Sequence, residues 1–438
     1  MTKEESFSQG LKYEIKNGAA WVVGIGSCED ENLLIPMVTE DGYKVVGIEE
    51  EAFAEQENII SVIIPKSIEI IKGCAFGRCY NLKSVKLHYG LKEIRGYAFA
   101  DCTSLTSIEI PSSVINIGNN PDLQELSKEE ILLRQIFGEK SAGGVSSGNP
   151  FKGCSKLRSI RVNSSNPVYH DHINSLIDTQ KKTLVSGCKN SHIPDDDSVE
   201  IIGDHAFSGC TRLNYIYRFE DSKIKTIGYK AFENCSSMQF VHFPETLTHI
   251  DSEAFRGCQS LSEISLPDSL TSIGGGAFSK CDKLYKLEIP SQLAKIGYGA
   301  FSDCRNLNIV SYNENSKVTE IADETFSGCV SLMSVHLPKS LQKIGESAFE
   351  QCRNLQHIDF PNSLEHIEKN AFKSCENLED IFIPESVTSI EKDAFLDCWP
   401  SLDTIKCSTN IKPENWDPEW NRKGSSTYYK IIWGYKES

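Results

Sequence analysis

The chain has 438 residues, 39% of them hydrophobic, and a formal net charge of −16. Nucleic acids and anionic membrane surfaces require clustered Lys and Arg, so this acidic balance argues against both as partners. No stretch is long and apolar enough to span a membrane, which excludes membrane insertion.

The N-terminal segment, residues 1–44, is expected to form a cap. Its first residues, MTKEESFSQG, lack the basic start and apolar stretch of a secretory signal. The expected location is therefore cytoplasmic, or the cell surface or exterior if the native start lies upstream. Residues 11–36 predict a short hairpin about the turn KNG, followed by a degenerate coil that ends at Ile35–Pro36.

Residues 45–405 repeat with a period marked by phenylalanine, mostly 23 residues and twice 25. In most copies Ala precedes the Phe, Cys follows three residues later, and Leu or a related apolar residue follows six later. Aliphatic residues follow at nine and eleven, Pro often at twelve, Leu or Val at fifteen, Ile at eighteen and often Gly at nineteen. The thirteen markers are Phe53, Phe76, Phe99, Phe151, Phe207, Phe232, Phe255, Phe278, Phe301, Phe326, Phe349, Phe372 and Phe395.

Each copy predicts one coil of a mainly β repeat solenoid. In the segment LSEISLP, Ile264 and Leu266 alternate with Glu263 and Ser265, as in a half-buried strand, and Pro267 ends it. We expect the Gly of IGxxAF to turn the chain with a positive φ. One coil cannot bury its own apolar face, so copies stack around a shared core and equivalent strands form a parallel sheet.

Twelve of the sixteen cysteines fall at the position three after Phe. Stacking would place their side chains in parallel, which does not suit a disulfide, and we interpret them as small, buried apolar thiols. That interpretation fits a reducing compartment. The chain has no CxxC and no paired His at zinc spacing, so we expect no metal and no cofactor.

Two insertions interrupt the repeat. The first, 119–149, predicts a helix: SKEE at 127–130 fits a capping box, and an apolar stripe follows it. This helix packs on the flank of the solenoid or docks a partner. The second, 163–198, predicts a hairpin from the runs NSLID and KTLVS.

The repeat ends near Cys398, and residues 406–438 contain three of the five tryptophans: Trp416, Trp420 and Trp433. We interpret this segment as a C-terminal cap that buries its aromatic rings. The alternative is an exposed carbohydrate-binding surface.

The pattern AFxxCxxLxxIxIPxSLxxIGxxAF resembles the Treponema pallidum-type leucine-rich repeat of BspA-like proteins over residues 45–405. The resemblance implies a right-handed, curved solenoid with a parallel β-sheet and short turns, 3-10 or helical segments on the other side. It also implies microbial surface proteins that act as adhesins and bind host proteins.

Positions eight and ten after each Phe point away from the predicted core. They are polar in the early coils but aromatic in the middle of the chain, where exposed rings favour an interface. The alternative is that these neighbours only stabilise the sheet. The predicted partner-binding residues are Tyr215, Tyr217, Phe240 and His242 on adjacent coils, with Tyr285 one residue out of register nearby.

No catalytic motif stands out: GxSxG, HExxH, a P-loop and a complete GxGxxG are all absent. The run HDH at 170–172 has no matching ligand and is expected in a loop, and His336 with His357 is a weak metal candidate. We therefore predict a non-enzymatic scaffold that binds a protein. A carbohydrate- or cell-wall-binding module is the alternative.

Overall fold

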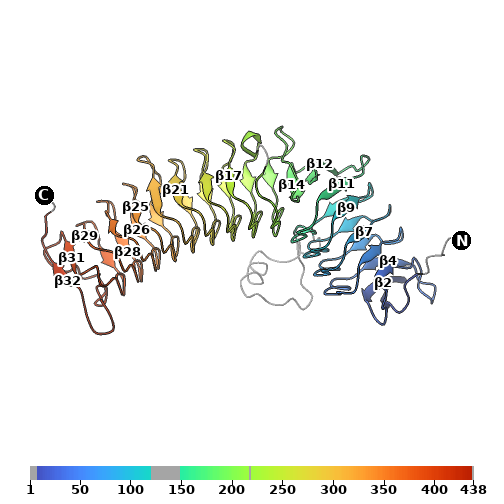
Figure 1. The fold of residues 1–438 in the computed structure, drawn as a ribbon, viewed down its shortest axis with the longest axis horizontal. Helices are drawn as coiled ribbons and strands as arrows, with labels where there is room; N and C mark the ends of the chain where they lie inside the picture. The colour runs from blue at the N-terminus through green and yellow to red at the C-terminus, as the bar shows by residue number, and fades with distance from the viewer. Residues whose placement is uncertain (1–6, 120–147, 217–218, 437–438) are drawn as a thin grey trace. The chain divides into compact units, whose positions relative to one another are not determined.

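The computed structural model describes residues 7–119, 148–216 and 219–436, which form stacked coils of short parallel strands (Figure 1). The chain divides into two compact units, Met1–Pro194 with Ile202–Cys210 and Asp195–Ile201 with Thr211–Ser438. The mainly β solenoid predicted from the repeat is confirmed. The helix predicted at 119–149 lies, apart from its ends, outside the described residues. Among the described residues the only helical segment is a 3-10 turn, η2 (Phe219–Asp221).

Most coils contribute two strands. The longer lies eight to eleven residues after the marker Phe, where the sequence predicts it, and the shorter covers the Ile at position eighteen. In the first unit, the longer strands pair in parallel as β3 (Asn32–Leu34), β5 (Ser61–Ile63) and β7 (Ser84–Lys86), and as β9 (Ser107–Ile110) with β11 (Ser159–Val162). The shorter strands pair one after another, beginning on β2 (Ala19–Gly24). They are β4 (Val45–Ile48), β6 (Ile70–Ile71), β8 (Glu93–Ile94) and β10 (Asn116–Ile117).

The second unit repeats this arrangement. Its longer strands are β17 (Phe240–His242) with β19 (Glu263–Ser265), then β21 (Lys286–Ile289), β23 (Ile309–Tyr312), β25 (Ser334–His336) and β27 (His357–Ile358), then β29 (Ile381–Ile383), β31 (Thr404–Cys407) and β32 (Lys430–Ile432). Its shorter strands are β16 (Thr226–Ile227), β18 (His249–Ile250), β20 (Ser272–Ile273) and β22 (Lys295–Ile296), then β24 (Glu320–Ile321), β26 (Lys343–Ile344), β28 (His366–Ile367) and β30 (Ser389–Ile390). The strand β15 (Ile201–Ile202) falls at the boundary in the chain between the units.

Antiparallel pairs occur at the start of the chain and in the second insertion. Strands β1 (Lys12–Lys16) and β2 (Ala19–Gly24) form the predicted hairpin, and its turn residues Asn17 and Gly18 both have positive φ, as a two-residue hairpin turn requires. In the insertion, the two predicted runs are β13 (Ser175–Asp178) and β14 (Thr183–Ser186), which pair antiparallel. A third strand, β12 (Tyr169–His172), pairs with β13 and contains the HDH run that the sequence analysis placed in a loop.

The marker phenylalanines stack along the interior of each unit. Ring centroids of neighbours lie 4.9 Å apart for Phe53 and Phe76 and 5.2 Å apart for Phe255 and Phe278, with nearly parallel planes. These rings are buried, as are the alanines before them. Each coil removes a large aromatic area from water, and this burial favours the stacking of neighbouring coils.

The cysteines three residues after a marker Phe, here called the ladder cysteines, have a role beyond filling space. All sixteen cysteines are free, and burial raises the pKa of ladder thiols such as Cys258 and Cys304 to about 12. Most ladder thiols donate a hydrogen bond to the Phe carbonyl of the preceding coil; for Cys304 and Phe278 the distance is 3.2 Å. The thiol thereby satisfies a buried acceptor at the tight turn.

The Ser or Thr two residues after the coil proline is also a donor between coils. Its hydroxyl donates to the carbonyl 22 residues earlier, at 2.6–2.7 Å. The observed pairs are Ser113 to Leu91, Thr246 to Ile224, Ser269 to Leu247, Ser340 to Val318 and Ser363 to Leu341. This explains the recurring PxSL without any exposed function for the serine.

The predicted reason for the Gly of IGxxAF, a positive φ, is wrong. Gly203, Gly274, Gly297 and Gly345 do not have positive φ; a Cβ on Gly297 would lie 2.5 Å from the backbone N of Gly275 in the preceding coil. Glycine is needed there for close approach between coils. Positive φ instead occurs two residues before and two after the marker Phe, for example at Glu253 and Lys280.

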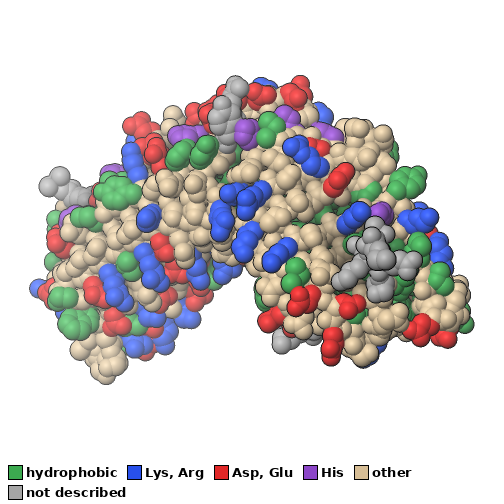
Figure 2. All heavy atoms as spheres, turned by 45° about the vertical axis from the view of Figure 1, so that its right-hand side comes forward, with side chains coloured by type: hydrophobic (Ala, Val, Ile, Leu, Met, Phe, Trp, Pro, Cys, Tyr) green, Lys and Arg blue, Asp and Glu red, His purple; other side chains and the backbone are tan. Residues whose placement is uncertain are grey.

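Ion pairs between side chains 23 residues apart also join neighbouring coils, and Figure 2 shows side chains of opposite charge next to one another over the surface. Examples are Arg78 with Glu55 (2.6 Å), Lys92 with Glu69 (2.7 Å) and Lys373 with Glu350 (2.9 Å). The exposed pairs each contribute only about 0–1 kcal/mol.

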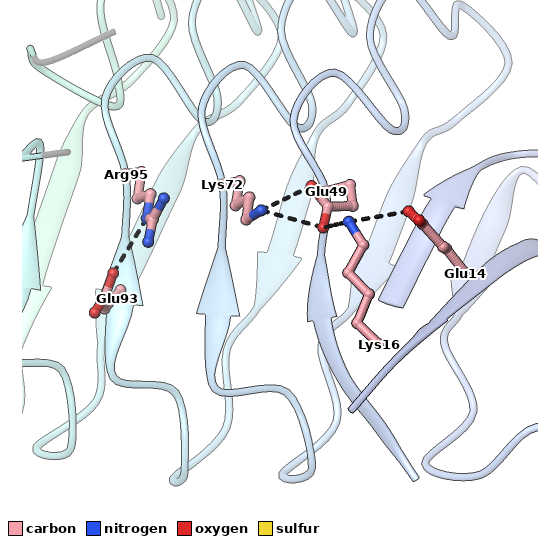
Figure 3. A network of polar contacts seen from close by, with 6 residues as sticks. All are labelled: Glu14, Lys16, Glu49, Lys72, Glu93 and Arg95. Carbon is pink, nitrogen blue, oxygen red and sulfur yellow. Dashed lines mark hydrogen bonds and ion pairs between the residues drawn. The ribbon is translucent and has the colours of Figure 1, made fainter. Parts of the chain in front are cut away.

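Glu49 forms a more buried set of ion pairs. Its side chain is 15% exposed and accepts hydrogen bonds from the Nζ atoms of Lys16 (2.8 Å) and Lys72 (2.9 Å) (Figure 3). Burial alone would raise the pKa of Glu49, but the hydrogen bonds and charges of the two lysines outweigh it and hold that pKa below its usual range.

We expect Glu49→Gln to lower the free energy of unfolding by about 1–2 kcal/mol at neutral pH. Because the folded-state pKa is below the unfolded one, this stabilisation is present above the unfolded-state pKa and is lost as the pH falls through the folded-state value. The difference between variant and wild type should therefore shrink below about pH 4, as measured by urea unfolding across a pH series. Glu14→Gln is the control, since Glu14 contacts Lys16 but is 56% exposed; an equal loss there would contradict the prediction.

Candidate functional site

The outer face of the longer strands follows the predicted alternation. In β9 and β21 the residues alternate between exposed and buried, and the exposed ones are Ser107, Glu109, Lys286 and Glu288. Ile264 and Leu266, which the sequence analysis placed inward, are half-buried. The exposed positions on this face are mainly polar, which makes any apolar cluster on it conspicuous.

One such cluster, here called the aromatic patch, comprises Tyr215, Phe240 and His242. Tyr215 is 51% exposed and Phe240 41%, and their rings stack with centroids 6.1 Å apart and planes 12° apart. The imidazole of His242 lies 5.6 Å from the Phe240 ring. Tyr215 and Phe240 occupy the same position in successive coils, so the solenoid register brings them together, as the sequence analysis predicts.

The patch borders a shallow hollow of about 250 Å³. Ile216 and Val241 also line it, together with Phe219 and Glu220 of η2. Phe219 is buried, and its ring meets that of Phe243 edge to face at 6.1 Å, which anchors η2 on the solenoid. Glu220 is exposed and adds the carboxylate of the hollow.

Two further predicted binding residues cannot be assigned to the patch. Tyr217 lies outside the described residues. Tyr285 is 56% exposed, but a full coil, which carries Glu263 and Ser265, separates it from the coil of Phe240, and its hydroxyl donates to Oδ1 of Asn308 at 3.5 Å. Tyr285 therefore belongs to a different part of the same face.

Phe219 and Glu220 are functional candidates that the sequence analysis did not identify. Their signal is the 25-residue spacing from Phe207 to Phe232, two residues longer than the usual coil. The extra length lies beside the aromatic positions, where η2 forms. A longer coil next to exposed aromatic side chains indicates that the extra residues form additional surface beside them.

The histidine clusters do not assemble a metal site. His357 pairs with Ser334 in register, so His336 is offset from it by two residues. Asp171, between His170 and His172, is used by Arg161 (3.0 Å) and by the backbone N–H of Val162 (2.8 Å). Within residues 7–119, 148–216 and 219–436, no group of three or more His, Cys, Asp and Glu could hold a metal ion.

The C-terminal tryptophans are mostly inside. Trp416 and Trp420 are almost fully buried, with ring centroids 5.0 Å apart, and Trp420 meets Phe395 edge to face at 6.1 Å. Trp433 is half-buried against Trp416. Buried rings offer no platform to a sugar, so the aromatic patch is the stronger candidate for recognition.

Comparisons with known proteins agree with this repeat. The family model for the BspA type leucine rich repeat region matches residues 46–135, 178–308 and 306–414, in six copies. The search of curated proteins found no match. No helix in the described part of the chain is both long and apolar enough to cross a membrane.

Solved structures of bacterial leucine-rich repeat proteins are similar. One from Bacteroides ovatus is 25% identical, over 92% of this chain and 94% of that chain, with a TM-score of 0.56. The protein from T. pallidum is 30% identical over 43% of this chain and 86% of that one, with a TM-score of 0.36. A cell surface protein from Faecalibacterium prausnitzii is 21% identical over 92% and 88%, with a TM-score of 0.39.

Proposed function

Because this chain belongs to the family of BspA-type leucine-rich repeat proteins, we propose that it is a non-enzymatic scaffold that binds a protein partner through the outer face of its longer strands. The observation that carries this proposal is the aromatic patch beside its hollow, on a face that is otherwise mainly polar. An adhesin-like role, in which the partner is a host protein, is part of the proposal.

The chemistry of the patch favours a protein interface. Exposed aromatic side chains are enriched at the centres of protein interfaces, whereas Glu, Lys and Ser are depleted there and common at rims. The patch has this layout: Tyr215 and Phe240 at the centre, with Glu220 and Glu263 at its margins. Burying the two rings under a partner would remove a large apolar area from water.

A carbohydrate ligand fits the patch less well. Sugars stack on open aromatic faces, but Tyr215 and Phe240 lie face to face, which leaves only one face of each ring free. The hollow beside them, at about 250 Å³, is also smaller than the usual small-molecule site. The two most buried tryptophans of the C-terminal segment are not accessible at all.

We expect Tyr215→Ser and Phe240→Ser each to weaken partner binding by about tenfold or more, because each removes a central aromatic contact. The partner is first identified by photo-crosslinking from a benzoylphenylalanine placed at position 240 of the full chain, and its affinity is then measured by surface plasmon resonance. Both residues are about half exposed, so the urea midpoint of each variant should stay close to that of the wild type.

Tyr89→Ser is the matched control, since Tyr89 is 75% exposed and lies far along the chain from the patch. Protein crosslinks that form equally well from position 89 and position 240 would overturn the placement. Binding of the wild type, but not of Phe240→Ser, to a glycan array would replace the protein partner with a carbohydrate.

A further inference from the structure

The hollow beside the aromatic patch combines two kinds of group that attract a cation. The rings of Tyr215, Phe240 and Phe219 line it, and the only Asp, Glu, Lys or Arg among its described lining residues is Glu220. The faces of aromatic rings attract guanidinium and ammonium groups, and a carboxylate next to them adds a charge-assisted hydrogen bond.

A second carboxylate lies next to Phe240. Glu263 pairs in register with Phe240 from the neighbouring strand and is exposed. On the outer face of the next coil, Lys286 forms an ion pair with Glu288, so its charge is already compensated. The chain as a whole carries a net charge of −16, which draws basic partners from a distance.

The size of the hollow points to a single side chain rather than a free small molecule. Its volume of about 250 Å³ lies below the range of about 300–1,000 Å³ that is usual for small-molecule sites. Phe240 and His242, which line it, are exposed residues of β17, so a partner polypeptide that lies across the strands can reach it.

We propose that the hollow takes an arginine side chain from a basic segment of the protein partner. The planar guanidinium stacks on aromatic rings and presents two N–H groups to one carboxylate, which an ammonium group cannot do. In this arrangement the guanidinium packs against Tyr215 and Phe240 and donates to Glu220. The inference rests on the proposed function and names the chemistry of the partner at the same site.

The test uses the full chain and three fluorescein-labelled peptides: repeats of Gly-Ser-Arg, the same repeats with Lys, and the same repeats with Gln. Fluorescence polarisation at physiological salt gives the affinities. We expect the Arg peptide to bind about tenfold more tightly than the Gln peptide and several-fold more tightly than the Lys peptide. Glu220→Gln should weaken binding of the Arg peptide about five- to tenfold, and Phe240→Ser at least as much.

Glu288→Gln is the matched control, because it removes the same charge from the same face away from the hollow. It should leave the affinity for the Arg peptide unchanged. Equal losses in Glu220→Gln and Glu288→Gln would show diffuse attraction only and overturn the proposal, as would equal affinity for the Arg and Gln peptides.

The experiments distinguish failure of the arginine site from failure of the proposed function. A partner whose capture depends on Phe240 but not on Glu220 overturns the arginine site and leaves protein binding at the patch intact. Arg-peptide binding that depends on Glu220, in a chain whose crosslinked partner does not depend on Phe240, overturns the protein interface and leaves a cation site. Circular dichroism and urea midpoints of every variant exclude misfolding as the cause.

Discussion

Replacement of Phe278 by alanine should destabilise the second unit by about 3–5 kcal/mol. Its ring lies between those of Phe255 (5.2 Å) and Phe301 (5.4 Å) and is fully buried. The substitution removes the ring and leaves a cavity that the regular backbone cannot close. Each coil is stabilised mainly by its two neighbours, so a break in the ring stack also weakens the coupling between coils on either side.

Urea unfolding followed by far-ultraviolet circular dichroism and by tryptophan fluorescence measures both effects. The tryptophans lie only near the two ends of the chain, so their signal reports the terminal coils, whereas circular dichroism reports all of them. We expect the two transitions to separate in Phe278→Ala. Phe240→Ala is the control: its ring is 41% exposed, and it should lose less than about 1 kcal/mol. Equal losses in the two variants would contradict the importance of the internal ring stack.

The sequence predicts the coil because the features that define it are local. A 23-residue period, alternation in the longer strand and a terminal proline each depend on residues close together in the chain. Because Phe, Ala and Cys recur at fixed positions, their repetition alone predicts that they stack in the core. These features are enough to derive the fold class and the buried stack.

The contacts between coils are less accessible to that reasoning. The thiol of Cys304 donates to the carbonyl of Phe278, and the hydroxyl of Ser340 donates to that of Val318; both acceptors belong to the preceding coil. Only a known separation between coils identifies such partners. The same separation explains why residue 297 is glycine. Local turn rules attribute this glycine to a positive φ, which it does not have.

The candidate site contains one feature that the repeat predicts and one that it does not. Register alone predicts that Tyr215 and Phe240 meet, because they occupy equivalent positions in successive coils. Phe219 and Glu220 come from an irregular 3-10 turn, whose conformation no repeat position dictates. Both residues line the hollow, so part of its wall comes from that turn.

Replacement of Trp420 by alanine should destabilise the C-terminal coils by about 3–5 kcal/mol, the range for large buried aromatics. Trp420 covers Phe395, the last ring of the stack, and packs against Trp416, whose indole N–H donates to the carbonyl of Val387 at 3.3 Å. Without this cover the terminal coil exposes its core to water. Hydrogen exchange should increase in β29, β30 and β31 and remain unchanged in β17 and β19.

Tyr428→Ala is the control, because Tyr428 lies in the same segment but is 53% exposed, and it should cost less than about 1 kcal/mol. The competing interpretation makes the C-terminal aromatics a carbohydrate-binding surface. It predicts the opposite pattern, in which Trp420→Ala keeps the urea midpoint of the wild type and loses binding to cell-wall oligosaccharides. Since a ring that is almost fully buried must become exposed before it can touch a sugar, loss of stability is the result that the structure requires.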